Sequence, residues 1–169
     1  MRINLSWQEF QQLAPKLAAL GEALIERTGM VMLAEPILKA MDRVKELYKG
    51  NNGLRVVFPS PQAQVLSQQT SRDLSVVDGI AFICGHYKGI DERVREAVVT
   101  DEISIGDYVV TGGELPTMVI LDSVVRLIPG VLGDEESANT DSFAHDLLDH
   151  PHYTRPEEVK GLKVPEVLM

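Results

Sequence analysis

The sequence predicts an α/β fold in which a parallel sheet carries helices on both faces. Two short apolar runs of strand length, residues 54–58 and 80–84, flank a polar segment at residues 62–72 that has helical character. Strands that alternate with helical crossovers are typical of parallel sheets. The chain has 169 residues, of which 44% are hydrophobic and 24% charged, so we expect one domain of ordinary size with a packed core.

The first predicted element is an amphipathic helix over residues 7–27. Ser6 and Glu9 form a possible capping box at its start, and apolar side chains then recur every three or four residues. Pro15 lies inside this pattern and lacks a backbone donor, so we expect a kink or two shorter helices. Gly29 ends the pattern.

A second helix should begin near Pro36 and end at Gly50, because proline suits a first helical position and glycine a helix end. Its apolar residues share one face: Ile37, Met41, Val44 and Tyr48.

Further along the chain, strands and helices alternate. Ser60 and Pro61 are expected to cap and begin the crossover helix over residues 62–72. A third strand is predicted at Tyr108–Thr111. Residues Pro116–Leu127 are apolar on most faces, which indicates a buried helix.

The net charge of −9 is concentrated in the second half of the chain, since residues 86–169 hold 17 of the 25 acidic residues. At face value this charge argues against nucleic-acid binding, which depends mostly on Lys and Arg.

The acidic run from Asp134 to Asp149 is interpreted as a solvated surface, with a metal-binding acidic protein as the alternative. No stretch is apolar enough to span a membrane and no leader pattern is present, so we expect a cytoplasmic location.

Three loops rich in glycine or proline are candidate ligand sites: residues 59–62, 85–89 and 111–116. In open parallel sheets, ligands bind beyond the carboxyl ends of the strands, where glycine lets the backbone approach closely. None of the three loops carries the usual fingerprint for dinucleotides or nucleoside triphosphates. Taken singly, each loop is better explained by ordinary turn geometry.

The residues that carry metal or nucleophilic chemistry form no clear site by themselves. His150 and His152 are the one close histidine pair, and the intervening Pro151 favours a surface turn over a zinc site. Cys84 ends an apolar run and is interpreted as a buried structural thiol. Arg155, taken alone, is typical of a surface salt-bridge residue. We therefore predict no metal.

Longer motifs are more specific. The runs Cys84–Val94 and Ser104–Pro116 closely resemble the bacterial tRNA (guanine-N1)-methyltransferase family. Further motifs extend the match in the family's order: Ile128–Gly133, Asp141–Phe143 and His152–Pro156. The resemblance covers residues 28–169.

This resemblance implies a methyltransferase domain of the SPOUT class, in which an α/β domain contains a deep trefoil knot. It also implies S-adenosyl-L-methionine as the cofactor, a homodimer whose active sites are built from both subunits, and the guanine immediately 3′ of a tRNA anticodon as the substrate. The family's cofactor-binding positions correspond to Pro61, Gly85, Ile105, Gly106, Asp107, Tyr108, Val109, Val110, Gly112, Gly113 and Pro116.

The resemblance assigns Arg155 as the catalytic arginine. Methylation of guanine N1 requires loss of the N1 proton, and the resulting negative charge spreads onto O6. A base and a nearby cation or donor are therefore needed. Arg155 would stabilise O6, while the methyl transfer itself needs in-line positioning and no metal.

The sequence departs from the family at both ends and within one motif. Residues 1–27 replace the family's first strand with a non-family amphipathic helical segment, and we expect the family's helical tRNA-binding C-terminal domain to be absent. Lys88 stands where many members have glutamate. We therefore expect impaired methyl transfer and weak tRNA binding. A non-catalytic cofactor-binding or dimerisation module is the alternative.

Overall fold

The computed structural model describes residues 31–48, 53–131, 141–143 and 147–168. The chain forms two compact units, residues 1–133 and 134–169, and each is described by itself. The helix predicted over residues 7–27 lies outside the described residues.

A three-stranded parallel sheet forms the centre of the first unit. Its strands are β1 (Arg55–Val65), β2 (Ile80–Phe82) and β3 (Asp101–Ser104), in the order β2–β1–β3. Residues 56–60 of β1 are buried, as expected for a central strand that is covered on both faces. Val57 of β1 pairs with Phe82 of β2 and with Asp101 of β3.

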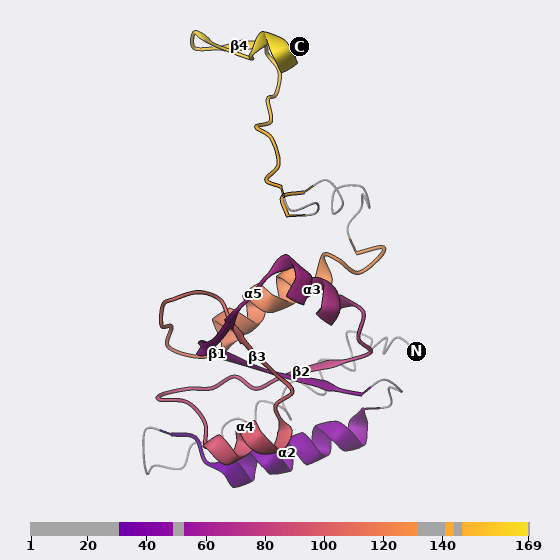
Figure 1. Ribbon diagram of the computed structural model, residues 1–169, viewed down its shortest axis with the longest axis vertical. Coiled ribbons are helices and arrows are strands. Elements are labelled where there is room, and N and C mark those ends of the chain that lie inside the picture. Colours follow the sequence, from indigo (N-terminus) through magenta and orange to yellow (C-terminus); the bar gives the residue numbers. More distant parts are fainter. Residues whose placement is uncertain (1–30, 49–52, 132–140, 144–146, 169) are drawn as a thin grey trace, which may run out of the picture. The chain divides into compact units, whose positions relative to one another are not determined.

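Among the described residues, two helices cover each face of this sheet (Figure 1). Helices α2 (Ala34–Leu47) and α4 (Glu92–Val98) pack together on one face. Helices α3 (Gln68–Ser75) and α5 (Glu114–Val125) pack together on the other. The predicted class, a parallel sheet with helices on both faces, is therefore confirmed.

Side chains that alternate along β1 divide the interior into two apolar clusters. Val56 and Phe58 belong to one cluster, together with Ile37 and Met41 of α2 and Val94 of α4. Val57 belongs to the other cluster, which also contains Leu74, Ile103, Ile120 and Val124. Each pair of helices is thus anchored on the same central strand, and this fixes the loops at the ends of the strands.

Helix α2 confirms the second predicted helix, with shifted ends. It begins at Ala34, so Pro36 is its third residue rather than its first, and it ends at Leu47 before the predicted stop at Gly50. Proline is tolerated in this first turn because the first N–H groups of a helix have no partner within it. Ile37 and Met41 are buried, as the apolar face predicts.

The predicted start of the crossover helix is wrong. Ser60 and Pro61 are part of β1, which continues to Val65, and the helix begins only at Gln68. Ser67 is the actual N-cap, since its hydroxyl accepts a hydrogen bond from the N–H of Thr70 at 3.1 Å. The pairing of β1 with β3 shifts register between Pro59 and Gln64, so the strand bulges where the helix was expected.

The third strand was also predicted in the wrong place. Asp101–Ser104 forms β3, whereas residues 108–111 form an irregular loop. The Ser104 hydroxyl ends the strand by donating to the carbonyl of Gly106 and accepting from its N–H, both at 3.1 Å. Val109 looks like a strand residue in the sequence, yet 85% of its surface is exposed.

Helix α5 confirms the helix predicted at Pro116–Leu127, although it begins and ends two residues earlier. The expectation that it is buried on most faces is wrong. Pro116, Ile120 and Val124 are buried on one stripe. Four other apolar side chains are exposed: Leu115, Met118, Val119 and Leu121.

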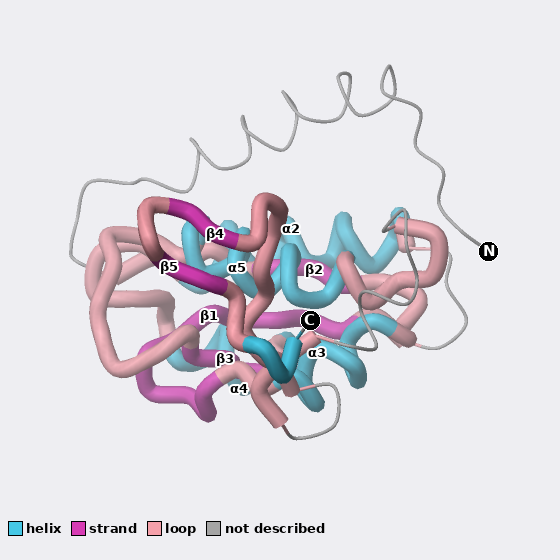
Figure 2. Tube along the Cα trace, turned by 90° about the horizontal axis from the view of Figure 1, so that it is seen from above, coloured by secondary structure: helices cyan, strands magenta, loops and turns pink. Residues whose placement is uncertain are grey.

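The second unit is small. Its strands β4 (Glu158–Val159) and β5 (Leu162–Lys163) lie side by side as an antiparallel pair (Figure 2), and a short 3-10 helix, η1 (Glu166–Leu168), follows. Across the described parts of both units, no helix combines the length and apolar character needed to cross a membrane.

Candidate functional site

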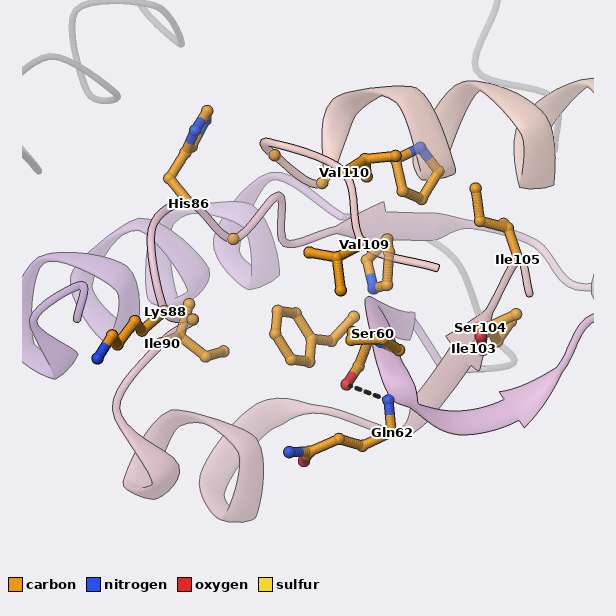
Figure 3. Close-up of a pocket in the computed structure, with 18 of the residues that line it drawn as sticks. Ser60, Gln62, His86, Lys88, Ile90, Ile103, Ser104, Ile105, Val109 and Val110 are labelled. Atoms are coloured by element: carbon orange, nitrogen blue, oxygen red, sulfur yellow. Dashed lines mark hydrogen bonds between the residues drawn. The ribbon is translucent and has the colours of Figure 1, made fainter. Parts of the chain in front are cut away.

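A cavity of about 600 Å³ lies in the first unit at the carboxyl ends of the three parallel strands (Figure 3). Three stretches of chain contribute most of its lining: residues 58–62 at the bulge of β1, residues 85–90 after β2, and residues 103–106 and 108–113 at the end of β3 and in the loop that follows it. They contain two of the three loops that the sequence marked as candidate ligand sites, residues 59–62 and 85–89, and the first half of the third, residues 111–113; Pro116 of that loop also lines the cavity. The cavity has the size and position expected of a small-molecule site in an open parallel sheet.

Most of the predicted cofactor-binding residues come together in this cavity. Ten of them line it: Pro61, Gly85, Ile105, Gly106, Tyr108, Val109, Val110, Gly112, Gly113 and Pro116. Asp107, which was predicted with them, lies in the same loop but is exposed and is not part of the lining. Arg155 belongs to the second unit, where it is exposed.

Backbone contacts join the second loop to the third. The N–H of Gly113 donates to the carbonyl oxygen of Gly85 at 2.8 Å, and His86 pairs with Gly112 in an isolated antiparallel bridge. A Cβ at Gly113 would stand 2.7 Å from the Cα of Cys84, so only glycine fits this crossing. The crossing closes one wall of the cavity.

The first loop supplies part of the lining through the bulge of β1. The hydroxyl of Ser60, a buried residue, accepts a hydrogen bond from the N–H of Gln62 at 3.3 Å (Figure 3). This contact satisfies a polar group in the bulge and turns the chain away from ordinary strand geometry. Phe58 lies next to it in the lining and belongs to the apolar cluster below.

Several charged groups of the lining are already paired. The guanidinium of Arg95 binds Glu102 with contacts of 2.6 and 3.1 Å and binds Glu92 at 2.9 Å. These carboxylates, the hydrogen-bonded Glu102 first, raise the pKa of Arg95 and keep it charged. Nε2 of His86 lies 2.5 Å from a carboxylate oxygen of Glu114, at the first residue of α5.

The sequence analysis assigned no cofactor role to several other lining residues, among them Phe58, His86, Lys88 and Arg95. His86 and Lys88 lie within the glycine loop at residues 85–89, so the position of that loop was the available signal. Arg95 comes from the middle of α4, and nothing in the sequence distinguishes it from an ordinary surface arginine.

The second unit brings together three groups that could ligate a metal. One atom from each of Asp149, His150 and His152 lies within 4.8 Å of the others, and all three residues are exposed. Each imidazole approaches the Asp149 carboxylate at 2.8 Å. The hydrogen bond with His152 is the main cause that lowers the pKa of Asp149. The histidine pair thus forms an exposed hydrogen-bonded cluster with Asp149.

The fold and the cavity define an α/β domain with a cavity of small-molecule size at the carboxyl ends of its strands. The chain belongs to the tRNA (Guanine-1)-methyltransferase TrmD family, whose model matches residues 23–169. The recognition of this family from the sequence motifs is therefore confirmed.

Curated relatives named tRNA (guanine-N(1)-)-methyltransferase support the same assignment. The protein of Oceanobacillus iheyensis is 57% identical over 141 residues, which cover 83% of this chain and 57% of the relative. Those of Desulforamulus reducens and Carboxydothermus hydrogenoformans are 52% and 54% identical over stretches of the same length. These stretches cover 55% and 54% of the two relatives, so the chain spans a little over half the length of the curated relatives it matches.

Proposed function

We propose that this chain binds S-adenosyl-L-methionine in the cavity of its first unit and transfers the methyl group to N1 of the guanine 3′ of a tRNA anticodon. The observation that carries the proposal is the convergence, in one cavity of about 600 Å³, of ten residues that the family resemblance assigns to the cofactor. Membership of the methyltransferase family supports the reaction type.

The chemistry of the lining fits this cofactor. Glycine-rich backbone at Gly85, Gly106 and Gly112 offers N–H and carbonyl groups to a nucleoside, and Phe58 and Ile90 offer apolar surface. The absence of a Cβ at Gly113 lets the two loops cross closely, and this crossing holds the glycine-rich backbone in place. When bound, the cofactor supplies an activated methyl group.

The remaining chemistry requires that the protein remove the N1 proton and stabilise charge on O6. We propose Arg155 as the cation for O6, because it lies in the His152–Pro156 motif shared with the family. Asp149 is a candidate base in the same unit: neighbouring hydrogen bonds lower its pKa, so the carboxylate is ionised and can accept a proton, as a weaker base than an unpaired aspartate. A second arginine, Arg126, directly follows α5 in the unit that holds the cavity.

We also propose that residues 28–169 form a SPOUT domain with a deep trefoil knot, acting as a cytoplasmic homodimer. Family membership supports this architecture. The net charge of −9 supports weak, salt-sensitive binding of tRNA by this chain. Sedimentation equilibrium tests the dimer, and a structure solved with the cofactor tests the knot.

Two measurements test the proposed function. Calorimetry with S-adenosylmethionine and with its demethylated product should give saturable binding, and no heat at millimolar ligand would contradict cofactor binding. Transfer of a tritiated methyl group to tRNA should depend on the guanine 3′ of the anticodon. Replacement of that guanine by adenine should abolish the incorporation, and equal incorporation into both RNAs would contradict the proposed specificity.

The role of Arg155 is tested by comparing two alanine variants, Arg155→Ala and Arg126→Ala. Arg155→Ala should lower the turnover about 10²–10³-fold, as expected for loss of a group that stabilises developing charge, with cofactor affinity unchanged. Arg126→Ala is the comparison. A large loss of turnover with Arg126→Ala and normal turnover with Arg155→Ala would assign the role to Arg126 instead.

A non-catalytic dimerisation module is the second candidate function. Exposed apolar side chains on one helix favour it, because Leu115, Met118 and Val119 of α5 are 58%, 64% and 49% exposed. A stable dimer that binds neither S-adenosylmethionine nor its product would support this candidate over the enzyme.

A further inference from the structure

Two cationic side chains that line the cavity, Arg95 and Lys88, differ in the ion pairs that they make. Arg95 is held by Glu92 and Glu102, whereas Lys88 makes no ion pair with any residue in the described part of the chain. This is notable in a protein with a net charge of −9, where carboxylates are plentiful. An exposed ammonium that lines a cavity and has no such partner is available to a ligand.

The position of Lys88 shows what kind of ligand it can meet. In Figure 3 its side chain runs outward, away from Ser60 and Val109, so its ammonium lies at the rim rather than inside the cavity. A small molecule enclosed by the loops would lie behind it. The ammonium is therefore available to a larger substrate that extends out of the cavity past Lys88.

The loop that carries Lys88 is held in a defined shape. The N–H of Gly89 donates to the carbonyl of His86, and the N–H of Met32 donates to the carbonyl of Gly89, both at 3.0 Å. Tyr87 has a positive φ of 58° and is 65% exposed. A strained residue that holds an aromatic ring in solvent is more typical of a binding surface than of an ordinary turn.

Lys88 directly follows the exposed Tyr87 in the chain. Cationic and exposed aromatic side chains are used together to bind single-stranded RNA, in which phosphates alternate with unstacked bases. We propose that Lys88 binds a backbone phosphate of the RNA, next to the nucleotide whose base enters the cavity. The inference rests on the proposed function and adds to it a substrate-positioning contact.

The test measures RNA and cofactor binding separately in the full chain. The RNA probe is a fluorescent anticodon stem-loop with guanine 3′ of the anticodon, and binding is followed by anisotropy. Lys88→Glu should weaken RNA binding roughly tenfold, and Lys88→Met should weaken it less while lowering the slope of log Kd against log salt by about one. Lys88→Arg should retain RNA binding close to that of the wild type.

Lys45→Glu is the matched control, because it makes the same charge change at an exposed position in the last turn of α2. It should change RNA affinity much less than Lys88→Glu. Cofactor affinity measured by calorimetry should be the same in all variants. Equal RNA affinity in the wild type and Lys88→Glu would overturn the inference, and so would a loss confined to cofactor affinity. Absence of cofactor binding by the wild type would instead contradict the proposed function.

Discussion

The N–H of Gly113 donates to the carbonyl oxygen of Gly85 at 2.8 Å, and this hydrogen bond fastens the loop after β3 to the loop after β2. The two backbones are so close that a Cβ on Gly113 would lie 2.7 Å from the Cα of Cys84 and 2.9 Å from the nitrogen of Gly85. Neither atom belongs to a flexible side chain, so the backbone itself would have to move. The shape of the cavity therefore depends on glycine at this position.

Gly113→Ala should weaken binding of S-adenosylmethionine about tenfold or more, because relieving the overlap displaces the cavity wall and overpacking of this kind costs about 1–3 kcal/mol. Calorimetry measures the affinity. Gly53→Ala is the control, since its φ of +77° also disfavours alanine but a Cβ there meets no atom within 4 Å. It should lower the melting temperature and leave cofactor affinity unchanged. Equal affinity in Gly113→Ala and the wild type would contradict the prediction.

The Asp91 carboxylate should make stability depend on pH in the acid range. It caps α4 by accepting from the N–H of Arg93 at 2.9 Å and also binds the Arg93 guanidinium at 2.8 and 2.9 Å. These bonds, the side-chain bond first, lower the pKa of Asp91 from 3.8 to about 2. A lowered pKa means that the stabilisation is complete above about pH 4 and is lost as the pH falls towards 2.

Asp91→Asn should therefore be less stable than the wild type at neutral pH, and the difference should shrink between pH 4 and 2. Urea unfolding followed by circular dichroism at a series of pH values measures it. Asp42→Asn removes the same charge from an exposed position on α2 and serves as the control. A difference that stays constant from pH 6 to 2 would show that the Asp91 carboxylate contributes no acid dependence.

The sequence best predicted the helices and strands whose buried side chains recur at the regular spacing of that element. The spacing of Ile37 and Met41 identified α2, and the apolar run at residues 54–58 identified the start of β1. The glycine loops and family motifs identified most of the cavity, because close backbone crossings such as that at Gly113 demand particular residues. In these places local pattern and tertiary structure agree.

The errors arose where one local pattern suits two structures. Ser60 and Pro61 resemble a helix start, but the φ that proline fixes is also compatible with a strand. The pairing of Pro59 and Gln64, on either side of them, with β3 keeps this segment in the strand as a bulge. Residues 108–111 have strand-like side chains, yet these lie along the cavity and not in the sheet. The place of Arg95 in the lining follows from the packing of α4, which no local signal records.

Substitution in the second apolar cluster should destabilise the first unit. Ile120 of α5 has no exposed surface and packs with Val57 of β1 and Ile103 of β3. Ile120→Ala should lower the free energy of unfolding by about 2–5 kcal/mol, whereas Ile120→Val should lower it by about 0.5–1.5 kcal/mol. Met118→Ala on the same helix is the control, because Met118 is 64% exposed and should change stability little. Urea unfolding gives all three values, and similar effects for Ile120→Ala and Met118→Ala would contradict this packing.

The thiol of Cys84 should react slowly with alkylating reagents, although it is the only cysteine in the chain and directly precedes the cavity residue Gly85. Burial raises its pKa, the nearby Glu114 carboxylate raises it further, and a 3.4 Å contact with the Thr117 hydroxyl opposes the rise. Because the thiolate is the reactive form, a raised pKa means a smaller reactive fraction at any given pH.

Alkylation by iodoacetamide at about pH 8, followed by mass spectrometry, should be slower than that of N-acetylcysteine and should accelerate as the pH rises beyond the ordinary range of a thiol. Thr117→Val removes the opposing contact at nearly constant volume, so the variant should react more slowly still. A rate equal to that of the free thiol would show that Cys84 is neither shielded nor electrostatically disfavoured as a thiolate.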